Sequence, residues 1–453
     1  MRLGETAETR RLLFKGTIKE TNVGMQATAA MGERYAQTPT VSRAYAWCVF
    51  ALTFGLLLAD YMSRQVLNAV FPLLKAHWSL TDTQLGSLSS IVSLMVGLLA
   101  FPLSILADRW GRVRSLFFMA MLWSLATLGC AVSANYGQMF AARLFIGVGE
   151  AAYGSVGLAV VLSVFPAHLR ATLSGSFLAG GSFGSMLGMA LSGIVAAHLG
   201  WRWSFVTMAV FGFVLALIYR VVVTEQRIAP GHMTGSRATG TRPPFAPREL
   251  ARALFASKSI VFAYLGCGVQ LILPGALFVW LPSYLLRAYD MPLDRASVVA
   301  AIFVLTSGVG LVVCGMLTDR ISRHHPARKW MMAIVYCVIS GAAFAVAFQL
   351  PPGNLQLTLI GVGMLVESGV CGPTGALVAE LTPSRIHGTA MAIWALANNL
   401  LGLAAGPVII GMLADRMGLH AALELIPLAT VVSTLLFVAG RRLYSRDVAR
   451  PAG

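Results

Sequence analysis

Four charged side chains stand out because they interrupt long apolar stretches of the sequence. Asp60 and Arg64 lie in one stretch, and Arg143 and Glu150 lie in another. A charge at the centre of a bilayer costs at least about 2.5 to 3.5 kcal/mol, so a charge kept there needs a reason. In a helix, residues four apart share a face, which lets Asp60 pair with Arg64. Residues seven apart do the same, which places Arg143 and Glu150 together.

These two pairs can meet if their helices run antiparallel. A rise of about 1.5 Å per residue then places Arg64 and Arg143 at similar depth, and Asp60 and Glu150 within about one turn. Substrate binding that engages or releases an arginine changes the proton affinity of a neighbouring carboxylate, and the planar guanidinium suits a carboxylate or phosphate. The cluster therefore indicates proton coupling and anion binding. The alternative is an ion network that only braces the two helices, and for Arg143 the two readings are evenly matched.

Other polar side chains lie at membrane depth in the second half of the sequence. Glu367 could pair with the first cluster across a cavity or bind a cation; alternatively it is a neutral acid bonded to Ser or Thr. Aromatic residues in such segments often serve as packing or interfacial anchors, so cavity and packing roles both stay open for the remaining set. That set of cavity candidates is Gln270, Trp280, Tyr284, Trp394, Asn398 and Asn399.

The elements that must position these side chains are membrane helices. Of 453 residues, 57% are hydrophobic and 11% charged, which is about half the charge of a soluble domain. A helix needs roughly 20 apolar residues to cross a bilayer, and twelve stretches qualify. They are 44–70, 84–107, 112–132, 138–163, 170–198, 202–223, 258–286, 296–318, 329–349, 355–379, 386–414 and 420–440. The eleventh could also be one helix plus a re-entrant piece.

The sequence divides into two groups of six helices. We predict an N-terminal tail over 1–42, a first bundle over 43–223, a linker rich in proline and polar residues over 224–257, a second bundle over 258–441 and a tail over 442–453. Most of the 34 Lys and Arg residues lie in the tails, the linker and the loops on the same side, which predicts that both termini are cytoplasmic, in a cell (inner or plasma) membrane. The net charge of +16 is thus a topology signal, and we expect no nucleic-acid partner.

Enzymatic and nucleotide-driven functions find no support in the sequence. It has no HExxH, GxSxG or Walker motif, and its six cysteines are isolated in apolar runs. We therefore expect no catalytic residues, no metal and no cofactor. A monomer suffices.

The two halves repeat short motifs, as transporters with internal symmetry do. Ile146-Gly147-Val148-Gly149 in the first half matches Ile360-Gly361-Val362-Gly363 in the second, and the loop 106–112 (LADRWGR) is echoed over 317–323 (LTDRISR). Two similar halves around a linker are suited to alternating access. The first half could then rock against the second about a site near the middle of the membrane.

These motifs resemble the signatures of the major facilitator superfamily. The resemblance covers about 41–441 and implies twelve helices in two pseudo-symmetric six-helix bundles. It also implies that the loop charges form a cytoplasmic gate, in which an acid near a helix N-terminus is stabilised by the helix dipole. The gate candidates are Asp108, Arg109, Arg112, Asp319, Arg320 and Arg323. Asp415-Arg416 has similar letters, but it falls on the other side of the membrane and is interpreted as a coincidence.

Within that superfamily the first half is most similar to spinster-like transporters, with anion:cation symporters as the alternative. The former usually carry an adjacent Asp-Arg pair in the first helix, whereas here Asp60 and Arg64 are separated by three residues. We expect a secondary transporter that moves a small organic solute, an anion by preference, with protons. The alternative function is an uncoupled facilitator or exporter of a lipid-like or drug-like amphipathic compound.

Overall fold

The computed structural model describes residues 41–166, 169–228, 254, 257–383 and 386–448, and within these ranges it is all helical. It contains twelve helical segments long and apolar enough to cross a membrane, which confirms the predicted number of spans. The eleventh stretch is one such segment, from His387 to Met417. The predicted tail 1–42 and the linker lie largely outside the described residues.

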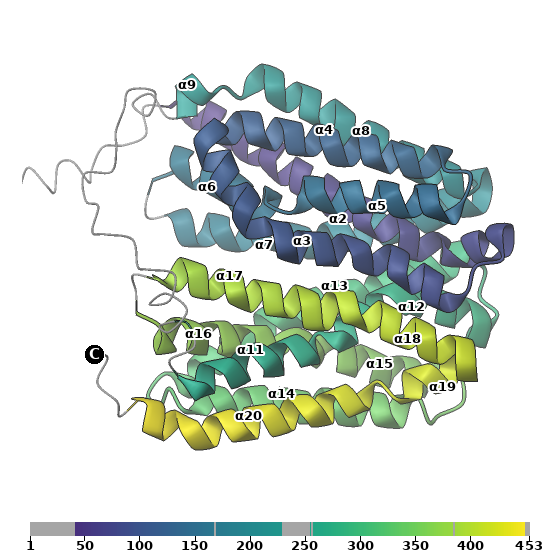
Figure 1. Ribbon diagram of the computed structural model, residues 1–453, viewed down its shortest axis with the longest axis vertical. Helices are drawn as coiled ribbons and strands as arrows, with labels where there is room; N and C mark the ends of the chain where they lie inside the picture. Colours follow the sequence, from purple (N-terminus) through teal and green to yellow (C-terminus); the bar gives the residue numbers. More distant parts are fainter. Residues whose placement is uncertain (1–40, 167–168, 229–253, 255–256, 384–385, 449–453) are drawn as a thin grey trace, which may run out of the picture.

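Figure 1 shows the helices in two layers. The upper layer holds the first six spans: α2 (Arg43–Trp78), α3 (Asp82–Trp110), α4 (Arg112–Val132), α5 (Tyr136–Glu150) with α6 (Tyr153–Val164), α7 (Arg170–Leu199) and α8 (Trp201–Val222), followed by the short α9 (Glu225–Ile228). We call the end of the molecule where α2 begins and α20 ends the tail end, and the opposite end the far end.

The lower layer holds the other six spans. They are α11 (Lys258–Gln270) with α12 (Ile272–Tyr289), α13 (Leu293–Ser322), α14 (Arg328–Ala347), α15 (Asn354–Glu367) with η2 (Ser368–Val370) and α16 (Cys371–Leu381), α17 (His387–Ala397) with η4 (Asn398–Ala404) and α18 (Ala405–Met417), and α19 (Leu419–Glu424) with α20 (Pro427–Val448). Helix α20 extends beyond the predicted boundary at 441. Its Asp447 carboxylate accepts hydrogen bonds from Ser257 and Ser259, which ties it to the start of α11.

Several helix starts follow directly from local sequence. Thr81 and Gln84 form a reciprocal capping box at the start of α3, so that both orphan backbone N–H groups are bonded. The Asn135 side chain caps α5 by accepting from the Gln138 N–H, and the Ser42 hydroxyl caps α2. Helices α3 and α5 thereby begin at fixed positions near the far end.

Several spans are interrupted near their middle. The fourth span breaks at Ala151–Ala152, the seventh at Leu271 and the tenth at η2, and the eleventh passes through the π-helical segment η4. Discontinuous helices are typical of transporter binding sites, because their free backbone groups and side chains face a cavity. Two of these breaks directly follow an acid, Glu150 in the fourth span and Glu367 in the tenth.

The layers are joined mainly by α7 with α13 and by α3 with η4 and α18, and α2 also contacts α12. Glycines allow the backbones to touch: a side chain at Gly86 would collide with the Pro407 carbonyl, and one at Gly411 with the Asp82 carbonyl. Farther along, Gly97 lies against Asn399. Helices α3 and α18 therefore run antiparallel in close contact.

Candidate functional site

The structure brings three of the predicted charges into one cluster in the first bundle. The Arg64 Nε lies 2.6 Å from Glu150 Oε2 and 3.9 Å from Asp60 Oδ1. The Ser63 hydroxyl lies 3.1 Å from Glu150 Oε1 and 2.8 Å from the Asp60 carbonyl oxygen, and its single proton can be donated to either. Helix α2 and the end of α5 thus supply the cluster, as the antiparallel depth argument predicts.

The members of this cluster differ in accessibility. The Asp60 side chain is 3% exposed and that of Glu150 is fully buried, whereas 19% of the Arg64 side chain is exposed. The Arg64 guanidinium also lies 5.2 Å from the Tyr61 ring centroid, within cation–π range. Asp60 Oδ1 is buried without a hydrogen-bond partner. Arg64 is therefore the most exposed charge of the cluster, while the two carboxylates are shielded from water.

Arg143 lies at the depth of Arg64 but makes different contacts. Its guanidinium donates to the Leu88 carbonyl at 3.2 Å and to the Arg64 carbonyl at 3.5 Å, and its Nη1 is buried without a partner. These bonds join α5 to the backbones of α3 and α2. The observed geometry is that of a brace, with one donor left over.

Glu367 lies inside the second bundle, away from the first cluster. It is fully buried; its Oε1 accepts from the Ser307 hydroxyl at 3.2 Å, and Ser307 is 2.8 Å from the Ser368 hydroxyl. Its Oε2 is buried without a partner. Among the described residues no basic side chain pairs with it, so its surroundings match those of the neutral acid considered above, and the pairing across the cavity is not formed.

Three of the six cavity candidates lie near the broken helices of the second bundle. Gln270 donates to Ser340 at 3.2 Å, and its Oε1 is buried without a partner. Asn398 Oδ1 and Trp394 Nε1 are likewise buried and unpaired. Buried polar atoms that lack a partner are uncommon, and they mark places where a ligand group or water can bind.

The other three candidates make internal contacts. The Trp280 indole donates to the Pro407 carbonyl at 3.0 Å, and its ring packs against Phe71 of the first bundle. Tyr284 lies within hydrogen-bonding distance of Gln356 and His420. The Asn399 side chain donates to the Ala395 carbonyl at 2.9 Å. These contacts show packing within and between the bundles.

The predicted gate residues all lie at the tail end. Asp108 pairs with Arg112 at 3.0 Å, and its side chain is 63% exposed. The cap of α4 comes instead from Glu225 on α9, which accepts from the Arg112 and Val113 N–H groups at 2.9 Å each. Sequence reasoning did not identify Glu225 as a cap, because it lies 113 residues after Arg112 in the sequence.

The remaining gate candidates are exposed at the ends of their helices. In the part of the chain that the structure describes, Asp319, Arg320 and Arg323 make no hydrogen bond or ion pair, and neither does Arg109. The tail end thus carries free charges in this structure. Within the described ranges, no three His, Cys, Asp or Glu side chains converge as metal ligands.

Comparison with known proteins places this geometry in a family. The sequence matches the family described as the Major Facilitator Superfamily over residues 53–400 and 296–452. It is 25% identical over 375 residues to a probable L-galactonate transporter of Escherichia coli (strain K12), covering 80% of this chain and 82% of that one. It is 24% identical over 400 residues to the spinster homolog 3 of Danio rerio, covering 84% and 79% of the two chains.

The fold agrees with a solved structure. A bacterial homolog of the human lysosomal transporter Spinster, crystallised in an inward-facing and occupied conformation, superposes with a TM-score of 0.79 at 18% identity, covering 91% of this chain and all of that chain. The sequence match over most of the chain, the twelve spans and this superposition agree with one another. The chain belongs to the major facilitator superfamily and is a membrane transporter, not an enzyme.

Proposed function

We propose that this chain transports a small organic anion together with protons, using Asp60, Arg64 and Glu150. The observation that carries the proposal is the combination of one partly exposed guanidinium with two shielded carboxylates. Arginine binds a carboxylate through two parallel hydrogen bonds, so an anionic solute would compete with Glu150 for Arg64.

The charge balance of the cluster explains why protons would move with the solute. Two carboxylates face one directly paired guanidinium, and a buried charge without a partner is costly. Asp60 is the weaker partner of Arg64, at 3.9 Å, and its Oδ1 has no hydrogen bond, so it holds a proton in our proposal. When the solute takes Arg64, Glu150 loses its partner and also takes up a proton. Anion binding and proton binding then favour each other.

The relatives support a substrate class. The Escherichia coli protein is named a probable L-galactonate transporter, and galactonate is a hydroxylated carboxylate. The unpaired polar atoms of Gln270, Trp394 and Asn398 could bind hydroxyl groups, while Arg64 binds the carboxylate. We therefore propose a sugar acid or a similar hydroxylated acid as the substrate.

In this proposal the tail end faces the cytoplasm of a cell whose surface membrane contains the protein. The distribution of Lys and Arg supports this orientation, because basic loops are retained on the cytoplasmic side. The two layers of Figure 1 would then be the two bundles that rock against each other. Asp60 and Arg64 lie near the middle of α2, which spans Arg43–Trp78.

Reconstitution in liposomes with an imposed pH gradient tests the proposal. A pH-sensitive dye inside the vesicles reports proton entry as sugar acids, simple carboxylates, neutral sugars and lysophospholipids are added in turn. We expect proton entry with a sugar acid, and its loss in Asp60→Asn and Glu150→Gln. Glu424→Gln, which removes a surface acid, serves as the matched control. Solute entry without protons, equal in all variants, would contradict proton coupling and leave the cluster as a brace.

A second candidate, transport of an amphipathic compound, is favoured by an apolar cavity between the layers. It has a volume of about 370 Å³ and lies between α3, α5, η4 and α18. Its lining is apolar except for two serines: Ser87, Ser90, Ile91, Leu94, Phe140, Leu400, Ala404, Ala405 and Val408. Such a cavity suits an acyl chain. In the assay above, this candidate would be favoured if lysophospholipid, and not sugar acids, caused proton movement. Uptake of lysophospholipid without a change in the dye signal would favour it as well.

A further inference from the structure

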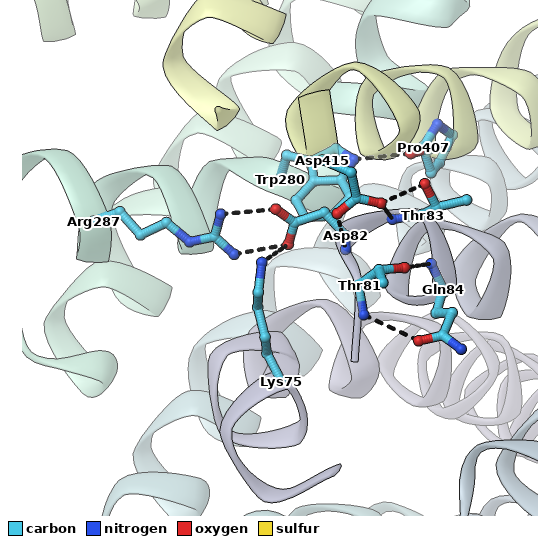
Figure 2. Close-up of polar contacts among 9 residues, drawn as sticks. All are labelled: Lys75, Thr81, Asp82, Thr83, Gln84, Trp280, Arg287, Pro407 and Asp415. Atoms are coloured by element: carbon cyan, nitrogen blue, oxygen red, sulfur yellow. Dashed lines mark hydrogen bonds and ion pairs between the residues drawn. The ribbon is translucent and has the colours of Figure 1, made fainter. Parts of the chain in front are cut away.

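The far end of the molecule is closed by a polar network that joins the two layers, shown in Figure 2. Asp82, the first residue of α3, lies at its centre. Its carboxylate accepts from both terminal nitrogens of Arg287 on α12, at 2.9 and 3.1 Å, and from Lys75 of α2 at 2.7 Å. The Asp82 side chain is only 4% exposed, whereas 31% of the Arg287 side chain is exposed, so the shielded partner is the carboxylate.

A second acid holds the backbone of the same helix start. The carboxylate of Asp415, near the end of α18, accepts from the Asp82 N–H at 2.7 Å, the Thr83 N–H at 2.9 Å and the Thr83 hydroxyl at 2.6 Å. An acid at a helix N-terminus both satisfies orphan N–H groups and interacts favourably with the helix dipole. Asp415 therefore acts as an N-cap supplied from the opposite bundle.

Next to these acids, helices α3 and α18 are in backbone contact. Gly86 and Gly411 leave no room for a side chain between α3 and α18, and the Trp280 indole bonds to the Pro407 carbonyl beside them. Separating the far ends would break the cap, the Arg287 pair and this packing together. Such a contact has two discrete states, closed or open, and is not continuously deformable.

The tail end of the same helix pair lacks such contacts. In the described part of the chain, every hydrogen bond and ion pair between the layers lies in the far half, at Asn68, Asp82 and Asp415. Equal steps along the antiparallel helices lead from Gly97 to Asp108 and from Asn399 to Gly388, near the start of α17. Among the described residues no side chain caps that start, and the exposed Asp108 lies at the corresponding position of α3.

We infer that Asp415 is the far-end counterpart of the tail-end gate residue Asp108, and that the two acids latch opposite states of the transport cycle. Both acids belong to the same short sequence, Leu-Ala-Asp-Arg, which occurs at 106–109 and at 413–416. The similarity interpreted as a coincidence from the sequence thus has a structural reason. Asp415 caps α3 when the far end is closed; Asp108 would face the start of α17 when the tail end is closed.

The inference rests on alternating access, but not on the identity of the solute or on proton coupling. Distances between spin labels, measured without substrate in lipid nanodiscs, test it separately. One pair, at the exposed residues Val132 and Leu355, spans the layers at the far end, and a second pair, at Arg114 and His324, spans them at the tail end. Labels are attached to cysteines in a background that lacks the six native cysteines and still transports.

In Asp415→Ala we expect the far-end pair to move apart and the tail-end pair to approach, with the ratio of the two states shifted roughly fivefold or more, the factor that loss of a helix cap is worth. Thr83→Ala, which removes one of three hydrogen bonds, should shift the ratio less. Arg416→Gln, in the same turn and exposed, is the matched control.

Equal distance distributions in Asp415→Ala and Arg416→Gln would overturn the inference, even if proton-coupled transport were established. If Asp415→Ala does not fold, Thr83→Ala and Asp415→Asn decide the question. Either must shift both label pairs in opposite directions, because a general loosening of the fold would broaden both pairs without that correlation.

Discussion

The two bundles each carry a buried acid at a helix break, but the surroundings of the two acids differ. Glu150 ends α5 and is paired with Arg64 at 2.6 Å, with Ser63 as an added donor. Glu367 ends α15 and, among the described residues, has only the Ser307 hydroxyl as a hydrogen-bond donor, at 3.2 Å. An ionised carboxylate at membrane depth needs a cation, whereas a neutral acid needs only a hydrogen bond. In our proposal the first bundle then carries an exchangeable charge and the second a resident proton.

The largest effect should come from removing the arginine of the first site, so that Glu150, like Glu367, has no basic partner. In Arg64→Gln, Glu150 keeps Ser63 but loses its cation, and removing one partner of a buried pair costs about 3–5 kcal/mol. We expect a marked fall in the melting temperature and loss of anion transport. The double variant Arg64→Gln with Glu150→Gln should recover most of the stability and none of the transport, as measured by thermal unfolding in detergent and by uptake in liposomes.

That prediction would fail if Arg64→Gln melted like the unaltered protein. Glu150 would then already be neutral, and the two acids would differ only in position. Arg112→Gln, which removes an exposed arginine from a surface pair, is the matched control for loss of a guanidinium. Its effect on stability should be within about 1 kcal/mol.

A smaller effect is expected when the second acid is changed. In Glu367→Gln the amide oxygen can still accept from Ser307, so stability should change by less than about 1.5 kcal/mol, the net worth of one hydrogen bond. If the proton on Glu367 takes part in coupling, gradient-driven uptake falls severalfold while solute exchange without a gradient is retained. If the variant and the unaltered protein gave equal uptake in both assays, Glu367 would have a structural role only.

The contrast between the two acids also shows what could be predicted from sequence. Spacing along α2 and α5 was enough to place Asp60, Arg64 and Glu150 together, because helix geometry fixes face and depth. The break after Glu150 has no nearby proline, and its local sequence does not predict it. The break after Glu367 does have a sequence cause, because Pro373 has no N–H to donate to the Gly369 carbonyl four residues earlier. The bonds of Arg143 to carbonyl groups of α3 and α2 depend on its rotamer, which spacing does not determine.

The far-end network could be predicted only in part from the sequence, for a different reason. Topology correctly assigned Asp415 to the end opposite the gate residues, but its contact with Asp82 and Thr83 joins segments more than 300 residues apart. Whether such segments touch depends on which state of the transport cycle is populated. A sequence encodes all states of the cycle, whereas one structure shows a single state.

Matched serine substitutions give the most direct test of the charge on each acid. Ser63 donates to Glu150 and Ser307 donates to Glu367, so the same substitution, Ser→Ala, can be made at both sites. A hydrogen bond to a charged group contributes about 1.5–3 kcal/mol, whereas one between neutral groups contributes about 0.5–1.5 kcal/mol. If Glu150 is ionised and Glu367 is neutral, Ser63→Ala should lower the free energy of unfolding about twice as much as Ser307→Ala. Each serine also contacts a second oxygen, the Asp60 carbonyl for Ser63 and the Ser368 hydroxyl for Ser307. Equal losses in thermal unfolding would mean that both acids carry the same charge, and proton exchange would then have to be sought at Asp60.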